Sequence, residues 1–79
     1  MAGVAPFKRG EFVRLKTGLA GSVGVVWQIQ PKSISSVVVY WRESETSRMQ
    51  QAHEPKDLVL VTTDAVPDYA IKLKESLGL

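Results

Sequence analysis

The sequence predicts a mainly β domain that ends in one α-helix. Three observations support this fold class: five short segments rich in β-branched and aromatic residues, clusters of Gly, Pro and Ser between them, and apolar spacings that lengthen from two residues to three or four after residue 64. The 79 residues are enough for one hydrophobic core only. Because 44% of the residues are hydrophobic, a disordered chain is excluded. We therefore expect one globular domain.

A glycine-rich turn separates the first two expected strands. Residues 11–17 form the first strand, because Val13 and Leu15 alternate with basic residues at the period of a half-buried strand. Residues 22–30 form the second strand, which is rich in β-branched and aromatic side chains. Pro31 ends it, because proline has no backbone N–H to donate to a sheet.

The remaining strands follow at short intervals. Residues 37–42 give the strongest strand pattern in the chain, and residues 48–52 give a weaker one after a polar turn. The proline of residues 55–57 favours a single 3₁₀ turn before the fifth strand at residues 58–62. Five short strands with one 3₁₀ turn before the last are typical of an SH3-like barrel.

An amphipathic helix is expected at the C-terminal end. Asp64 is placed to cap it, and Gly78 follows its last turn. Its apolar stripe, at spacings of three and four, is Val66, Tyr69, Leu73 and Leu77. An isolated helix of this length is marginal in water, so the stripe must pack on the barrel or dock on a partner. We expect a flexible N-terminal segment, the barrel and the helix at residues 1–9, 10–63 and 64–79.

Residues 9–26 resemble the KOW motif of ribosomal proteins and transcription elongation factors. In that motif an opening of Gly, an acidic residue, any residue and Val, here beginning at Gly10, is followed by turn glycines that lead into the second strand. The matching glycines are Gly18, Gly21 and Gly24, which we expect to be structural turn residues because a tight turn between bent strands needs positive φ and close backbone approach. The resemblance implies an SH3-like barrel of the KOW or Tudor-like kind and association with nucleic acid.

A candidate binding face follows from the alternation along the strands. If Val13 and Trp41 point inward, cations and rings of neighbouring positions point outward. Phosphates attract Lys and Arg, and unpaired bases stack on aromatic rings. The predicted face for RNA, DNA or another partner consists of Phe12, Arg14, Lys16, Tyr40, Arg42 and Arg48.

The charge distribution is compatible with a polyanionic partner. The whole chain carries +2, but residues 1–52 carry +4 and residues 53–79 carry −2. No apolar run is long enough for a transmembrane helix or a signal peptide, so we expect a cytoplasmic location.

Catalytic chemistry has little support. The chain has no cysteine and a single histidine, His53, which we interpret as a turn residue. His53, Glu54 and Asp57 are too few and too unfavourably spaced to predict a metal site. We therefore expect a non-catalytic binding module without cofactor, metal or small-molecule substrate.

Two alternatives stay open. Small SH3-like barrels also serve as accessory subunits or adaptors in larger complexes, and the apolar stripe of the C-terminal helix would suit protein docking. Trp27, Tyr40 and Trp41 would make an aromatic cage for a methylated cation if all three rings met at one surface. Core packing is the simpler interpretation of both tryptophans.

Overall fold

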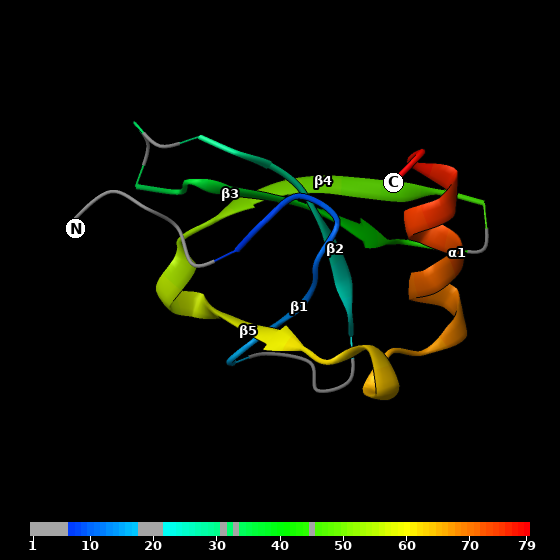
Figure 1. Ribbon diagram of the computed structural model, residues 1–79. Helices are drawn as coiled ribbons and strands as arrows, with labels where there is room; N and C mark the ends of the chain where they lie inside the picture. The colour runs from blue at the N-terminus through cyan, green and yellow to red at the C-terminus, as the bar shows by residue number, and fades with distance from the viewer. Residues whose placement is uncertain (1–6, 18–21, 31, 33, 45) are drawn as a thin grey trace.

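The computed structural model describes residues 7–17, 22–30, 32, 34–44 and 46–79. Five strands precede one α-helix, and two 3₁₀ turns flank the last strand (Figure 1). In chain order the elements are β1 (Phe12–Leu15), β2 (Gly24–Ile29), β3 (Val37–Arg42), β4 (Arg48–His53), η1 (Pro55–Asp57), β5 (Leu58–Val61), η2 (Thr63–Ala65) and α1 (Asp68–Ser76). The predicted mainly β class, the 3₁₀ turn before the last strand and the C-terminal helix are confirmed.

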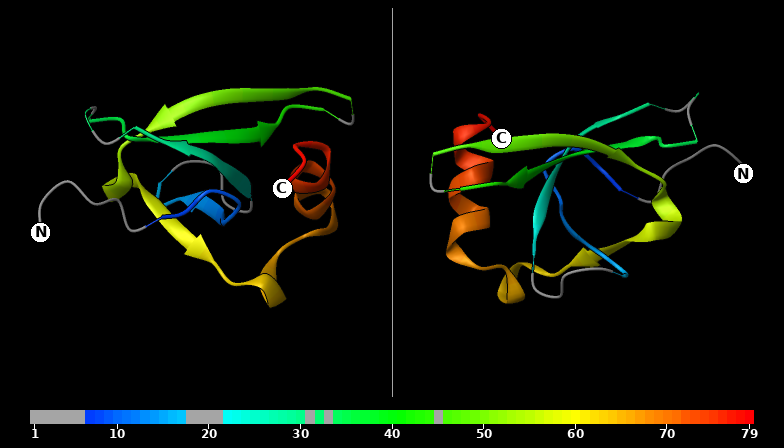
Figure 2. Two further views of the ribbon diagram at one scale, coloured as in Figure 1. Left: turned by 45° about the horizontal axis from the view of Figure 1, so that its top comes forward. Right: turned by 180° about the vertical axis from the view of Figure 1, so that it is seen from behind.

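All five strands belong to one antiparallel sheet with the order β4-β3-β2-β1-β5. The sheet is strongly curled, so that the β3–β4 hairpin passes over β1 and β5 (Figures 1 and 2). β4 and β5 lie at its two edges, and backbone pairing does not close the sheet. The register of β2 against β3 shifts between Val26 and Gln28, which leaves Trp27 as the extra residue of a β-bulge.

The concave face of the sheet holds the first hydrophobic core. Its buried residues are Phe7, Val13, Val26, Val37, Val39, Trp41 and Leu58, with Leu15 and Ile29 packed against them. β-branched residues dominate because they pack well on a pleated surface. Phe7 belongs to the segment 1–9 that was expected to be flexible, but it is only 7% exposed and packs in this core.

The KOW resemblance implied that Gly24 is a turn residue. In the structure it does not lie in a turn. It is the first residue of β2 and pairs with Val13 of β1. A Cβ at this position would lie 2.6 Å from side-chain atoms of both Trp41 and Val39. Glycine is therefore required by the close packing of the core. Gly18 and Gly21 lie outside the described residues.

Helix α1 covers the convex face and forms a second core there. Phe12, Val23, Val25, Ala70 and Leu73 are its buried residues. Tyr40, Val61, Val66, Tyr69, Leu77 and Leu79 pack around them. In the views of Figure 2 the helix stands at the end of the sheet where β3 turns into β4. The apolar stripe predicted for the helix thus packs on the chain's own sheet.

Both ends of the helix can be compared with the sequence prediction. Asp64 lies in η2, and residue Pro67 occupies the N-cap position without a side-chain hydrogen bond, so the predicted cap is wrong. The reason is that η2 turns the chain before the helix begins. At the other end Gly78 has a φ of 77°, and its N–H donates to the Glu75 carbonyl at 3.0 Å. The predicted glycine stop is confirmed.

Candidate functional site

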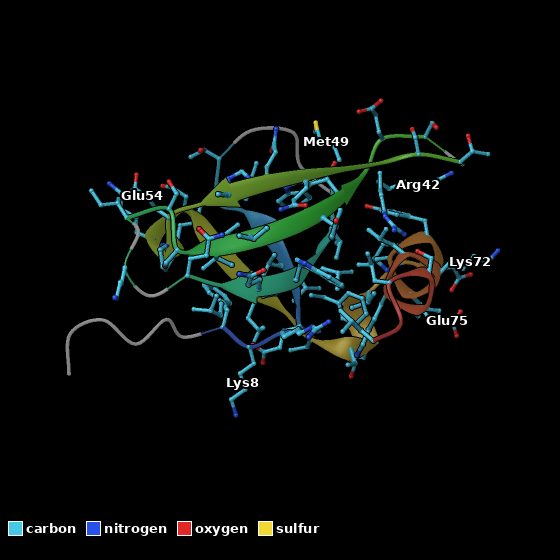
Figure 3. The ribbon with its side chains drawn as sticks, turned by 90° about the horizontal axis from the view of Figure 1, so that it is seen from above. Lys8, Arg42, Met49, Glu54, Lys72 and Glu75 are labelled. Atoms are coloured by element: carbon cyan, nitrogen blue, oxygen red, sulfur yellow. The ribbon has the colours of Figure 1, made fainter. Side chains whose placement is uncertain are left out.

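A groove of about 690 Å³ separates the β3–β4 hairpin from helix α1. Figure 3 looks down on this region and labels Arg42 at the end of β3 and Lys72 on the helix. The residues that line the groove are Arg42, Ser44, Thr46, Ser47, Arg48, Tyr69, Lys72, Leu73 and Ser76. We call it the hairpin–helix groove.

The lining of the hairpin–helix groove is basic. Arg42, Arg48 and Lys72 contribute three cations, four lining residues are Ser or Thr, and no described lining residue is acidic. Arg42 and Arg48 are direct cross-strand partners in the last pair of the hairpin. Like charges directly opposite each other destabilise a sheet. An anion bound between them would remove that repulsion.

Neutral groups hold the two guanidinium groups in place. The Arg42 Nε donates a hydrogen bond to the Ser44 carbonyl at 3.2 Å. The Arg48 Nη1 donates to the Ser76 Oγ at 3.1 Å, and that hydroxyl donates to the Leu73 carbonyl at 2.7 Å. In the described part of the chain the one ion pair joins Lys56 and Glu54, far from this groove in the sheet. The groove arginines therefore keep their charge available for a ligand.

Aromatic rings also help to hold the guanidinium groups of the two arginines in place. Arg42 lies 5.3 Å from the ring centroid of Tyr69, and Arg48 lies 5.2 Å from that of Tyr40. Each such contact is worth about 0.5–1 kcal/mol at an exposed site. The Tyr69 hydroxyl also accepts a hydrogen bond of 2.9 Å from the Val23 N–H, which ties the helix to the start of β2. The two walls of the groove are thus fixed to one scaffold.

A row of two neighbouring rings with a cation at each end continues from the groove along the convex face. Arg9 lies 4.5 Å from the ring centroid of Trp27, and the Trp27 and Tyr40 rings meet edge to face at 5.5 Å. Arg48 covers Tyr40 from the groove side. The Tyr40 hydroxyl donates to the Gln50 Oε1 at 3.0 Å. We call Arg9, Trp27, Tyr40 and Arg48 the cation–ring row.

The structure brings together half of the binding residues predicted from sequence. Tyr40, Arg42 and Arg48 lie in or next to the hairpin–helix groove. Arg14 and Lys16 are exposed on and after β1 and do not line the groove. They remain a separate basic region.

Phe12 requires a correction. Its side chain points to the convex face, as predicted, but it is only 7% exposed because α1 lies over it. The same row across the sheet, Val61, Phe12, Val25 and Tyr40, is set by the register of β5, β1, β2 and β3. Phe12 is therefore a core residue and has no free ring face for a base.

Several residues of the site were not predicted, among them the hydroxyl residues Ser44, Thr46 and Ser47 of the hairpin turn. Lys72 and Ser76 come from the polar side of a helix whose packing direction is not visible in the sequence. Arg9 was placed in a flexible segment, and Trp27 was interpreted as core. The signal for Trp27 is the alternation of β2: it follows Val26, which faces the concave core, so its own side chain points to the opposite face.

The apolar stripe predicted for the helix packs in the convex core, and two of its residues also line the groove. Val66 and Leu77 pack against the convex core, whereas Tyr69 and Leu73 both belong to that core region and line the groove. The helix therefore serves as a structural element and as one wall of the candidate site.

An aromatic cage is not formed. Trp41 lies in the concave core, 7% exposed, and its Nε1–H donates to the His53 Nε2 at 3.0 Å. Trp27 and Tyr40 lie on the opposite face of the sheet, packed with each other. The three rings therefore do not meet at one surface.

His53 is held as a hydrogen-bond acceptor. Burial lowers the pKa of this histidine below 6.5, and the nearby Asp57 carboxylate opposes the shift. A neutral imidazole is what the Trp41 N–H requires. Within the described residues no group of three His, Cys, Asp or Glu side chains is placed to hold a metal ion.

A second groove, of about 620 Å³, lies beside the first and shares Arg42, Ser44 and Tyr69 with it. Its apolar lining includes Leu15, Trp41 and Met49, the last of which is 38% exposed. In the described ranges no helix is both long and apolar enough to cross a membrane.

A scan against protein-family models, a search of curated proteins and a search of solved structures each return no match to this chain.

Proposed function

We propose that this chain is a non-catalytic binding module that associates with RNA or DNA through its convex face. The observation that supports the proposal most is the hairpin–helix groove, in which Arg42, Arg48 and Lys72 face one space and no described lining residue is acidic. Nucleic-acid backbones present a regular series of phosphates, and Lys and Arg side chains supply most of the affinity for them.

The groove suits phosphate groups for a physical reason. Guanidinium groups bind phosphate oxygens through paired N–H donors, and the serine and threonine hydroxyls add further donors. Because Tyr69 and Tyr40 already orient Arg42 and Arg48, little side-chain entropy is lost when a phosphate binds.

The architecture agrees with this proposal. We propose that the curled sheet is an SH3-like barrel of the KOW kind, because the strand order β4-β3-β2-β1-β5 and the 3₁₀ turn η1 before β5 are those expected for it. The glycine pattern of residues 9–26 supports the same assignment.

The proposal is tested by fluorescence anisotropy with labelled oligonucleotides of mixed sequence at low salt. We expect binding that weakens steeply as salt rises. Arg42→Glu and Arg48→Glu should each weaken it about tenfold or more, and each should lower the salt slope by about one. Lys32→Glu changes the net charge equally at an exposed position outside the groove, and it should have a smaller effect.

Two results would contradict the proposal. One is an absence of binding by the wild-type chain at low salt. The other is an equal loss with Lys32→Glu and with Arg42→Glu, since that would show only the nonspecific influence of net charge.

A protein-docking role is the second candidate, and one observation favours it. β4 forms one edge of the sheet, and five of its six residues are exposed. A free edge of this kind can accept an extended peptide as an additional strand. Capture of partners from a cell extract with and without nuclease separates the candidates, because partners held by β4 alone would survive nuclease treatment.

A further inference from the structure

The location of Trp27 is unusual for a tryptophan in so small a sheet. Its neighbour Val26 is fully buried in the concave core, so the alternation of a strand places the indole on the convex face, where it is half-buried. Trp27 is also the extra residue of the β-bulge, and bulges are frequent next to functional positions. The indole lies at the outer end of the cation–ring row, with Arg9 over it.

From this geometry we infer that the nucleic acid bound by the convex face is single-stranded and that an unpaired base stacks on Trp27. The inference rests on the proposed function and assigns its substrate class. In a duplex the faces of the bases are covered by their neighbours, so a ring platform is useful only to a strand whose bases are unstacked.

Arg9 occupies the place of the base in the unbound protein. It is exposed, its guanidinium lies 4.5 Å from the indole centroid, and no described carboxylate forms an ion pair with it. Base–ring stacking is stronger than an exposed cation–ring contact, so an incoming base displaces Arg9 from the ring. The released guanidinium then pairs with the phosphate next to that base.

The remainder of the row gives the strand a path. From Trp27 the rings continue to Tyr40, and Arg48 links Tyr40 to the hairpin–helix groove through its bond to Ser76. Bases would therefore lie toward the Trp27 end of the convex face, and phosphates toward Arg48 and Arg42 in the groove.

The two tryptophans provide an internal control for the experiment. Titration of ¹⁵N-labelled protein is followed through the indole N–H signals, with oligothymidine or oligouridine of about twelve nucleotides and with a duplex of the same length. We expect the Trp27 signal to move with the single strands. The Trp41 signal should stay, because its N–H is bonded to His53 in the concave core.

Affinity measurements with variants complete the test. Trp27→Leu should weaken single-strand binding about tenfold and leave duplex binding unchanged, whereas Trp27→Phe, which keeps a ring, should restore most of the loss. The Trp41 indole signal reports whether each variant is folded.

The outcomes separate the inference from the proposed function. If wild type binds the duplex as tightly as the single strands, or if Trp27→Leu binds single strands normally, the inference is wrong. In either case a loss with Arg42→Glu and Arg48→Glu would still uphold nucleic-acid binding. If the wild-type chain binds none of the three probes, both proposals are refuted.

Discussion

Leu73→Ala tests whether α1 is a structural part of the domain. Leu73 is 7% exposed in the convex core, where Phe12, Val23 and Val25 lie beneath the helix. Removing a buried leucine side chain costs about 2–5 kcal/mol. Because this site lies at the margin between helix and sheet, where neighbours can partly close the gap, we expect about 2–3 kcal/mol. That is a large share of the roughly 5–10 kcal/mol of a domain of this size.

Ile71→Ala is the matched control on the same helix. Ile71 is 41% exposed and belongs to neither core. We expect it to cost less than about 1 kcal/mol, because little apolar area is lost and alanine favours the helix.

Urea unfolding at neutral pH, followed by circular dichroism and tryptophan fluorescence, measures both variants. With a slope of about 1 kcal/mol per molar urea, Leu73→Ala should lower the midpoint by about 2–3 M and Ile71→Ala by less than about 1 M. Equal shifts, or an unchanged midpoint for Leu73→Ala, would refute the packing of α1 on the sheet. The helix would then be free to dock elsewhere.

Three further perturbations address the other contacts. Gly24→Ala should destabilise the domain by about 1–3 kcal/mol in the same assay, since its Cβ would lie 2.6 Å from the Trp41 ring, and an unchanged midpoint would show that the core has room. Tyr69→Phe should cost at least about 1 kcal/mol, because it leaves the Val23 N–H without its hydroxyl acceptor, and it should also weaken oligonucleotide binding; normal stability would argue against this bond. His53 should make stability fall as the pH drops below 6.5: its folded pKa is lowered by burial, so the unfolded chain takes up the proton first. Comparing urea midpoints at about pH 7.5 and 5.5 for wild type and His53→Gln checks this, and an equal fall in both would exclude His53 as the cause.

The strands were predictable because the side-chain patterns that specify them lie within each short segment of the sequence. Alternation along residues 37–42 and the proline of η1 mark elements whose side chains point to fixed faces whatever the rest of the chain does. The direction of Phe12 was predictable for the same reason. Its burial was not, since it depends on a helix that begins more than fifty residues later.

The candidate site was predictable only in part. Arg42 and Arg48 are marked by their positions at the ends of neighbouring strands. Lys72 joins them because α1 packs in one particular direction, and Trp27 lies outside the core because the pairing of β2 with its neighbours turns Val26 to the concave face instead. Both depend on long-range packing, which the local pattern of side chains does not contain.

The bond between Arg48 and Ser76 joins segments that are 28 residues apart. The hairpin–helix groove therefore exists only when α1 is seated on the sheet, and an unfolded or partly opened chain presents no such cluster of cations. A ligand that fills the groove binds the native state alone, and by mass action it raises the free energy of unfolding in proportion to the logarithm of its concentration. Binding in the groove and packing of the helix on the sheet are thus thermodynamically linked. The rise in unfolding temperature with ligand concentration therefore reports the affinity of the ligand.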